Sequence, residues 1–114
     1  MGSKVAVLGA GTMGHALALV YALGGHEVRL TDSSMSMLDK SGGLMETALA
    51  SLVENGEAPA HCTADWLHAQ VSRLPTLPET LEDADLIVEA IVENPEAKRT
   101  LFVQVDQYAP AQAV

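Results

Sequence analysis

The sequence predicts an α/β fold in which helices cover both faces of a parallel sheet, a doubly wound arrangement. Short apolar runs alternate with helix-forming segments along the chain, which is the pattern of a parallel sheet with crossover helices. The composition, 48% hydrophobic and 18% charged, is typical of a packed globular chain. A length of 114 residues is enough for one domain. We predict that residues 1–114 form one incomplete domain, truncated before the fifth strand of its sheet.

The first half of the chain is expected to hold two strands and two helices. Residues 4–9 (KVAVLG) form an apolar, β-branched run that predicts a strand buried on both faces. Residues 12–23 predict a helix with a nearly continuous apolar surface, and residues 27–31 (EVRLT) predict the second strand. Residues 35–53 carry apolar side chains at helical spacing. The helix could kink or break at Gly42-Gly43, because each interior glycine costs about 1 kcal/mol relative to alanine.

The second half is expected to repeat the alternation of strands and helices. A third strand is predicted over residues 70–74, and the clearest strand pattern is DLIVEAIV at residues 85–92. Residues 79–83 predict a short acidic helix between these strands. The last helix is expected to begin at the Asn-Pro pair 94–95 and to run to about residue 108.

A G-x-G-x-x-G motif lies between the first predicted strand and the first predicted helix. Its residues are Gly9, Ala10, Gly11, Thr12, Met13 and Gly14. In such a motif Gly9 allows the sharp turn, Gly11 lets a pyrophosphate approach the backbone, and Gly14 lets the helix pack closely on the strand. Backbone N–H groups of the first helical turn then face the phosphates. The motif in this context predicts a dinucleotide-binding site.

Asp32 stands at the end of the predicted second strand, where a carboxylate can accept hydrogen bonds from the adenosine ribose. The same carboxylate would repel a 2′-phosphate, and the next residues, Ser33, Ser34 and Met35, offer no arginine to bind one. The pattern therefore indicates NAD rather than NADP. The alternative is that Asp32 caps the helix that begins near Ser34.

Three charged residues around the last predicted strand have both a functional and a structural interpretation. Glu89 within the strand requires a partner, because a buried carboxylate is costly without one, and backbone N–H groups of a nearby loop are the structural explanation. Glu93 follows the carboxyl end of the strand, where ligands bind in doubly wound sheets. Lys98 falls in the first helical turn, where the dipole disfavours a cation. It either pairs with an anionic ligand or Glu93, or is a solvated lysine.

Charge and composition exclude several classes of partner. Six Lys and Arg against fifteen Asp and Glu give a net charge of −9, which argues against nucleic acid and anionic membranes. The single cysteine, Cys62, excludes an internal disulfide and fits a reducing compartment. With no membrane-length apolar run and no signal peptide before the first strand, the expected location is the cytoplasm. The four histidines, His15, His26, His61 and His68, share no metal-ligand spacing and are expected to be structural or solvated.

The glycine motif GAGTMG, Asp32 and the run IVEAIVEN together resemble the N-terminal domain of the 3-hydroxyacyl-CoA dehydrogenases. The resemblance implies a Rossmann-type domain followed by a helical dimerisation domain. It implies NAD-dependent interconversion of 3-hydroxyacyl and 3-oxoacyl thioesters, a reaction of fatty acid metabolism. By position, residues 9–14 would hold the pyrophosphate and Asp32 the ribose. Ala90, Glu93 and Lys98 would line the nicotinamide half of the site.

The chain departs from this family in two respects. The catalytic Ser/Asn segment and His–Glu pair of the family would follow the last residue, so no residue present is assigned as general base. The family's CoA-binding lysines are also missing, because no Lys or Arg occurs between Lys40 and Arg73. The substrate is therefore an acyl thioester, on CoA or on a carrier protein, or a free hydroxy acid.

Two other functions remain open from the sequence. One is a different NAD-dependent hydroxy-acid dehydrogenase, of the gulonate/crystallin, 3-hydroxyisobutyrate or glycerol-3-phosphate type, although the last two lack the IVEAIVEN run. The other is a non-catalytic nucleotide-binding module.

The oligomeric state follows from the predicted edge of the sheet. Truncation before a fifth strand would expose the apolar edge of residues 85–92, and such edges recruit partner strands. A homo-oligomer is therefore expected.

Overall fold

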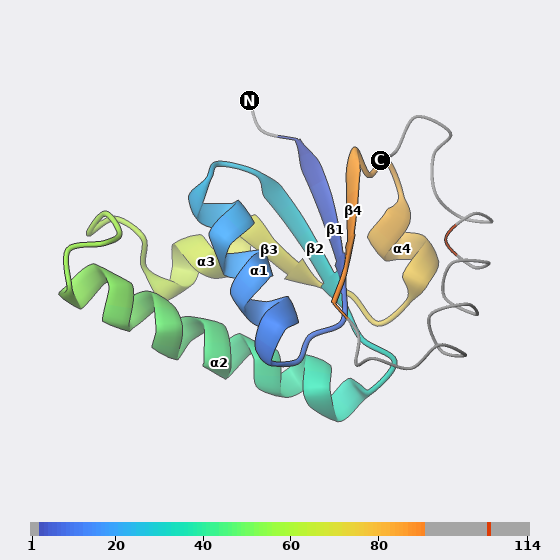
Figure 1. Cartoon of the computed structure of the whole chain (residues 1–114), viewed down its shortest axis with the longest axis horizontal. Helices are drawn as coiled ribbons and strands as arrows, with labels where there is room; N and C mark the ends of the chain where they lie inside the picture. Colours follow the sequence, from blue (N-terminus) through green and yellow to red (C-terminus); the bar gives the residue numbers. More distant parts are fainter. Residues whose placement is uncertain (1–2, 91–104, 106–114) are drawn as a thin grey trace.

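The computed structural model describes residues 3–90 and Val105, which form a four-stranded parallel sheet with helices on both faces (Figure 1). The elements follow as β1 (Lys4–Leu8), α1 (Thr12–Leu23), β2 (Glu27–Thr31), α2 (Met35–Glu54), α3 (Ala64–Gln70), β3 (Val71–Arg73), α4 (Leu77–Leu81) and β4 (Leu86–Glu89). The strands lie in the order β3-β2-β1-β4, and all pairs are parallel. The predicted fold class, a Rossmann-like α/β fold, is confirmed.

β1 is buried on both faces, as its unbroken apolar run predicts. Val5 and Val7 belong to the larger core, which β1 and β2 build with α1, α2 and α3. Ala6 and Leu8 face the opposite side and belong to a smaller core with Leu81 of α4. Figure 1 shows the sheet between α1 on one side and α4 on the other. The two layers hold the carboxyl end of β1 in place, and this fixes where the glycine-rich turn begins.

α2 is one continuous helix through Gly42 and Gly43, so the helix does not break at these glycines. The structure gives a reason for the first of them. A Cβ at Gly42 would lie 2.8 Å from Cζ of Arg73. The Arg73 guanidinium donates from Nη1 to the backbone carbonyls of Leu38 and Asp39, at 3.2 and 3.1 Å. Gly42 thus leaves room for an arginine that ties β3 to α2.

α3 has no counterpart in the sequence prediction, which placed no helix over residues 64–70. Its start has a clear local signal, because the Thr63 hydroxyl accepts a hydrogen bond from the backbone N–H of Trp66 at 3.3 Å. Asp65 lies in the first turn, where its charge opposes the helix dipole favourably. Leu67 then anchors this short helix in the larger core. A helix of seven residues has too little hydrophobic periodicity to be recognised beforehand.

The remaining boundaries shift by a few residues. Because α3 extends to Gln70, β3 is shorter than the predicted strand over 70–74. α4 begins two residues earlier than predicted, at Leu77, with Pro78 in its first turn. Proline is tolerated there because the first N–H groups of a helix have no acceptor within it.

The predicted helix over 95–108 and the end of the predicted strand over 85–92 lie almost wholly outside the described residues. Val105, which is described, is helical, half-buried and packs against the smaller core. Among the described strands β4 pairs only with β1, so its other side is an edge. Association through that edge stays a prediction. Within residues 3–90, every helix is too short or too polar to span a membrane.

Candidate cofactor-binding site

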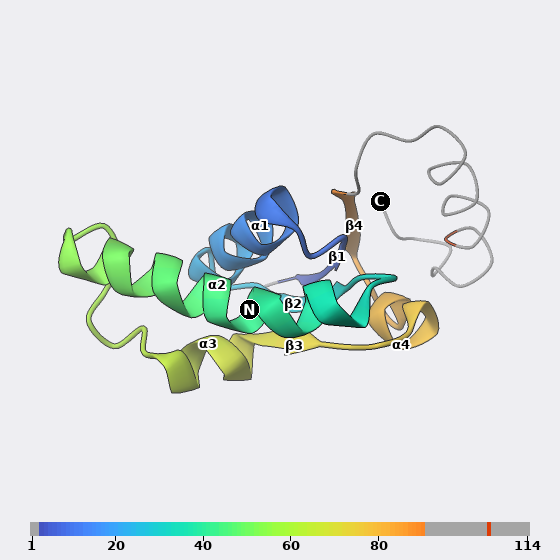
Figure 2. The ribbon, with the colours of Figure 1, turned by 90° about the horizontal axis from the view of Figure 1, so that it is seen from below.

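The glycine-rich turn lies at the carboxyl end of β1, where the chain passes into α1 (Figure 2). β1 is flanked by β2 on one side and β4 on the other. β1 leads to β2 through α1, whereas β4 is reached from β3 through α4, which lies on the opposite face of the sheet, so the strand order reverses at β1. In open α/β sheets ligands bind outside the carboxyl ends of the strands at such a reversal.

Two glycines of the turn are required by the fold itself. Gly9 has φ 112°, a left-handed conformation that side chains other than glycine rarely adopt, and its N–H donates to the Thr31 carbonyl at 2.8 Å. Gly14 packs directly on Gly9, because a Cβ at position 14 would lie 1.6 Å from the Gly9 carbonyl oxygen. The predicted roles of a sharp turn and of close helix–strand packing both agree with this geometry.

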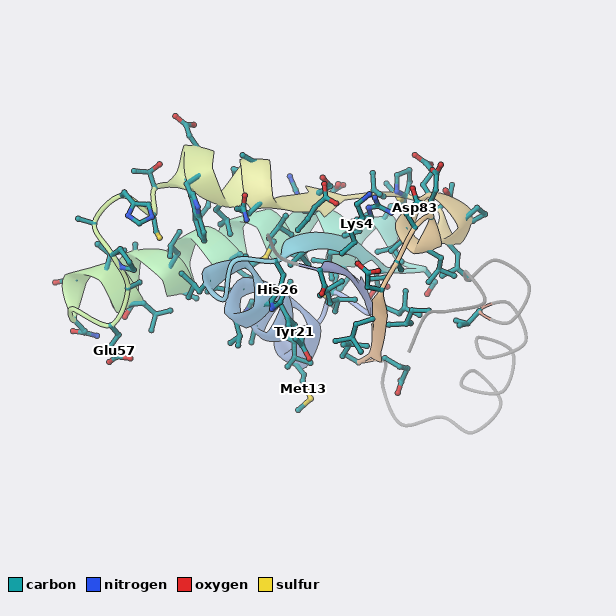
Figure 3. All side chains as sticks on the ribbon, turned by 90° about the horizontal axis from the view of Figure 1, so that it is seen from above. Lys4, Met13, Tyr21, His26, Glu57 and Asp83 are labelled. Atoms are coloured by element: carbon teal, nitrogen blue, oxygen red, sulfur yellow. The ribbon has the colours of Figure 1, made fainter. Side chains whose placement is uncertain are left out.

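The third glycine, Gly11, is not required by the fold. Its φ of −71° is open to any residue, and a Cβ there would meet nothing within 4 Å. Gly11 is also the N-cap of α1, yet no side chain caps the helix and its first turn holds no acidic residue. Met13, in that turn, has an exposed side chain that points away from the sheet (Figure 3). The start of α1 therefore presents bare backbone and N–H groups that have no acceptor within the helix, an arrangement that fits a diphosphate.

Asp32 lies beside this turn and accepts two backbone hydrogen bonds. Its Oδ2 accepts from the N–H of Ala10 and its Oδ1 from the N–H of Ser34, both at 2.8 Å. The N-cap of α2 is Ser34, whose hydroxyl accepts from the N–H of Met37 at 3.2 Å. The alternative that Asp32 caps α2 is therefore wrong. Each carboxylate oxygen keeps a further lone pair, so Asp32 can still accept from a ribose hydroxyl.

Ala90 is brought to the turn by the pairing of β4 with β1. Its N–H donates to the Leu8 carbonyl at 2.8 Å, and its Cβ lies 3.7 Å from the position that a Cβ of Gly14 would take. Glu89 is the last residue of β4 and half-buried, in register with Leu8, rather than buried inside a longer apolar strand. Glu93 and Lys98, the other two predicted contacts of the nicotinamide half, lie outside the described residues.

His15, which the sequence predicts to be structural or solvated, lies at the glycine-rich turn. Its ring nitrogen Nδ1 lies 2.8 Å from the carbonyl oxygen of Gly11, in the turn itself. The available signal was the spacing, because a side chain four residues after the N-cap can reach the N-cap carbonyl. His26 accepts a hydrogen bond from the N–H of Ser3, and His68 contacts the carboxylate of Glu46. Within residues 3–90 and Val105, no three His, Cys, Asp or Glu residues gather into a candidate metal site.

Comparison with known proteins agrees with this geometry. Residues 4–114 match the NAD-binding domain of 3-hydroxyacyl-CoA dehydrogenase. The chain belongs to this family. The family resemblance inferred from the glycine motif, Asp32 and the IVEAIVEN run is confirmed, and NAD is the cofactor of this domain.

Relatives show the same family along nearly the whole chain. The chain is 37% identical to the 3-hydroxyadipyl-CoA dehydrogenase of Escherichia coli, over 96% of this chain and 23% of the relative. It is 36% identical to a 3-hydroxybutyryl-CoA dehydrogenase of Clostridioides difficile, over 91% of this chain and 36% of the relative. The solved 3-hydroxybutyryl-CoA dehydrogenase of Escherichia coli K12 superposes on all of this chain with a TM-score of 0.87 at 33% identity, and 24% of that structure is covered. The chain thus spans about a quarter to a third of these relatives.

Proposed function

We propose that this domain holds NAD in an enzyme that interconverts 3-hydroxyacyl and 3-oxoacyl thioesters. The observation that carries the proposal is the glycine-rich turn with Asp32 bonded to it, in a chain that belongs to the 3-hydroxyacyl-CoA dehydrogenase family. The names of its relatives, which act on 3-hydroxybutyryl-CoA and 3-hydroxyadipyl-CoA, support an acyl thioester as the substrate class.

The residues of this chain would bind and orient the cofactor. The turn of residues 9–14 would hold the diphosphate through backbone N–H groups other than those of Gly9 and Ala10, which donate to Thr31 and Asp32. Asp32 would accept hydrogen bonds from the adenosine ribose. Ala90, Glu93 and Lys98 would lie along the nicotinamide half. When bound, NAD supplies the hydride acceptor. The close packing of the glycine-rich turn would hold the backbone groups of the turn in place for the cofactor.

The general base and the acyl pocket are proposed to come from the part of the enzyme that this chain does not span. Hydride transfer from a hydroxyl-bearing carbon needs a base within hydrogen-bond reach of that hydroxyl. Three of the four described histidines are engaged elsewhere: His15 bonds the turn backbone, His26 accepts from the N–H of Ser3, and His68 pairs with Glu46. The fourth, His61, is exposed in the connection between α2 and α3. A helical second domain that also dimerises would supply the missing groups and make the enzyme a homo-oligomer.

The 114-residue chain alone is expected to bind NAD without reducing it. The test mixes the chain with NAD and 3-hydroxybutyryl-CoA and follows the absorbance of the reduced cofactor, while calorimetry measures NAD binding. A rate above background that survives repurification would show that the base lies within these residues. Failure to bind NAD would contradict the cofactor site.

The substrate class is tested with the full-length gene product. It is expected to reduce NAD with a 3-hydroxyacyl thioester and not with glycerol 3-phosphate or a free hydroxy acid. Presenting the same acyl group on CoA and on an acyl carrier protein separates the two thioesters, since α2 carries no basic residue after Lys40 to meet the CoA nucleotide. Reduction by the free hydroxy acid alone would favour a gulonate-type reaction. No reduction with any substrate would favour a non-catalytic nucleotide module.

Asp32 is expected to make the domain prefer NAD to NADP by at least about tenfold, because placing a 2′-phosphate beside a carboxylate costs more than the roughly 1.4 kcal/mol that tenfold represents. Asp32→Ala should narrow this ratio mainly by weakening NAD. Calorimetric dissociation constants for both cofactors check the ratio, and Asp39→Ala, which alters an exposed carboxylate on α2, serves as the control. Equal affinities for the two cofactors in the unmodified chain would contradict this role.

A further inference from the structure

We propose that His15 positions the backbone of the glycine-rich turn for the diphosphate of the cofactor. Its ring nitrogen Nδ1 lies 2.8 Å from the carbonyl oxygen of Gly11, and its own backbone N–H donates to the same oxygen at 3.0 Å. A carbonyl oxygen only accepts, and it has two lone pairs. Nδ1 must therefore carry a proton, and both lone pairs of the Gly11 oxygen are engaged by one residue.

This contact fixes more than the carbonyl. The Gly11 carbonyl and the N–H of Thr12 belong to one planar peptide unit, so an oxygen held by two donors also fixes the direction of that N–H. Donation to the oxygen polarises the unit and strengthens the N–H as a donor. The N–H of Thr12 opens α1, at the helix end where an anion is favoured.

The turn has little else to hold this peptide unit. Gly11 carries no side chain that could restrain it, and a Cβ there would meet nothing within 4 Å. Glycine loses more conformational freedom on ordering than other residues. α1 also has neither a side-chain cap nor an acidic residue in its first turn. The imidazole of His15, half-buried one turn into the helix, restrains this peptide unit through its carbonyl oxygen.

The effect should be confined to the diphosphate part of the ligand. Asp32, proposed to bind the ribose, is tied to the turn through the N–H of Ala10 and to α2 through the N–H of Ser34, with no bond to His15. A ligand that has only the nucleoside therefore meets Asp32 but not the peptide unit that His15 holds. The inference rests on NAD binding at the turn and is independent of the acyl reaction.

The experiment compares three forms of the 114-residue chain: unmodified, His15→Ala and His15→Asn. Asparagine can place an amide N–H close to the position of Nδ1, so this variant keeps the donor without the imidazole. Dissociation constants are measured for ADP-ribose and for adenosine by titration, and urea unfolding records stability. His15→Ala should raise the dissociation constant for ADP-ribose by about fivefold, which corresponds to one net hydrogen bond. The dissociation constant for adenosine should change by less than about twofold. His15→Asn should recover most of the ADP-ribose affinity.

The ratio of the two dissociation constants does not depend on the folded fraction, so a change in stability does not obscure the result. The positioning role would be overturned if His15→Ala lost affinity for both ligands equally or for neither. It would also be overturned if His15→Asn bound ADP-ribose as weakly as His15→Ala. An unmodified chain that binds adenosine but not ADP-ribose would overturn both this role and the assignment of the turn to the diphosphate.

Discussion

Replacing Gly14 by alanine is expected to destabilise the folded chain by about 3 kcal/mol, the upper end of the usual cost of overpacking. The new Cβ would lie 1.6 Å from the Gly9 carbonyl oxygen and 2.5 Å from its carbon. Both are backbone atoms, so no side-chain rotation relieves the contact and α1 must move away from β1. The same movement displaces the N–H groups proposed to bind the diphosphate, so NAD affinity should fall by more than about 100-fold.

The control is Gly43→Ala, a second glycine in a helix. A Cβ at Gly43 would meet nothing within 4 Å, and alanine favours a helix interior by about 1 kcal/mol over glycine. This variant should be slightly more stable than the unmodified chain and bind NAD equally well. Urea unfolding at a constant m-value measures the first quantity and calorimetry the second. Equal stability of the two variants would show that α1 can shift at no cost.

Replacing Gly11 by serine is expected to separate cofactor binding from folding. Serine adopts the φ of −71° found here, its Cβ has open space, and it is a better N-cap than glycine. The stability of the chain should therefore stay the same or rise by a few tenths of a kcal/mol. The new side chain occupies the space where the backbone would approach the diphosphate, and its hydroxyl takes up an N–H group of the first turn. NAD affinity should fall by about 100-fold.

Gly11→Ala makes the matched comparison, since it adds the Cβ without the capping hydroxyl. It should bind NAD as weakly as, or slightly better than, the serine variant, and be less stable because alanine is a poor N-cap. Unfolding curves and calorimetric titrations of both variants check these results. Unchanged NAD binding in both would mean that the cofactor does not approach Gly11.

The sequence by itself determines the features of this domain that depend on local periodicity and spacing. The apolar run 4–9 and the short strand pattern at 27–31, with helix formers between them, predict two strands and a crossover helix. G-x-G-x-x-G between a strand and a helix predicts a sharp turn, because glycine adopts conformations that other residues rarely reach, such as the φ of Gly9. Asp32 at the strand end follows from the same short-range logic. These features predict a cofactor site at the end of the first strand without a tertiary structure.

Only the tertiary structure decides contacts between residues far apart in the chain. That Asp32 bonds the turn and does not cap α2 is decided by its hydrogen bond from the N–H of Ala10 and by Ser34 occupying the cap. From the sequence, Gly42 only weakens a helical pattern. The structure shows that a side chain there would collide with the Arg73 guanidinium, which bonds α2. Ala90 reaches the turn only because β4 pairs with β1. The physical reason is that periodicity and propensity describe the chain's own backbone, whereas these hydrogen bonds and close contacts exist only once the sheet is assembled.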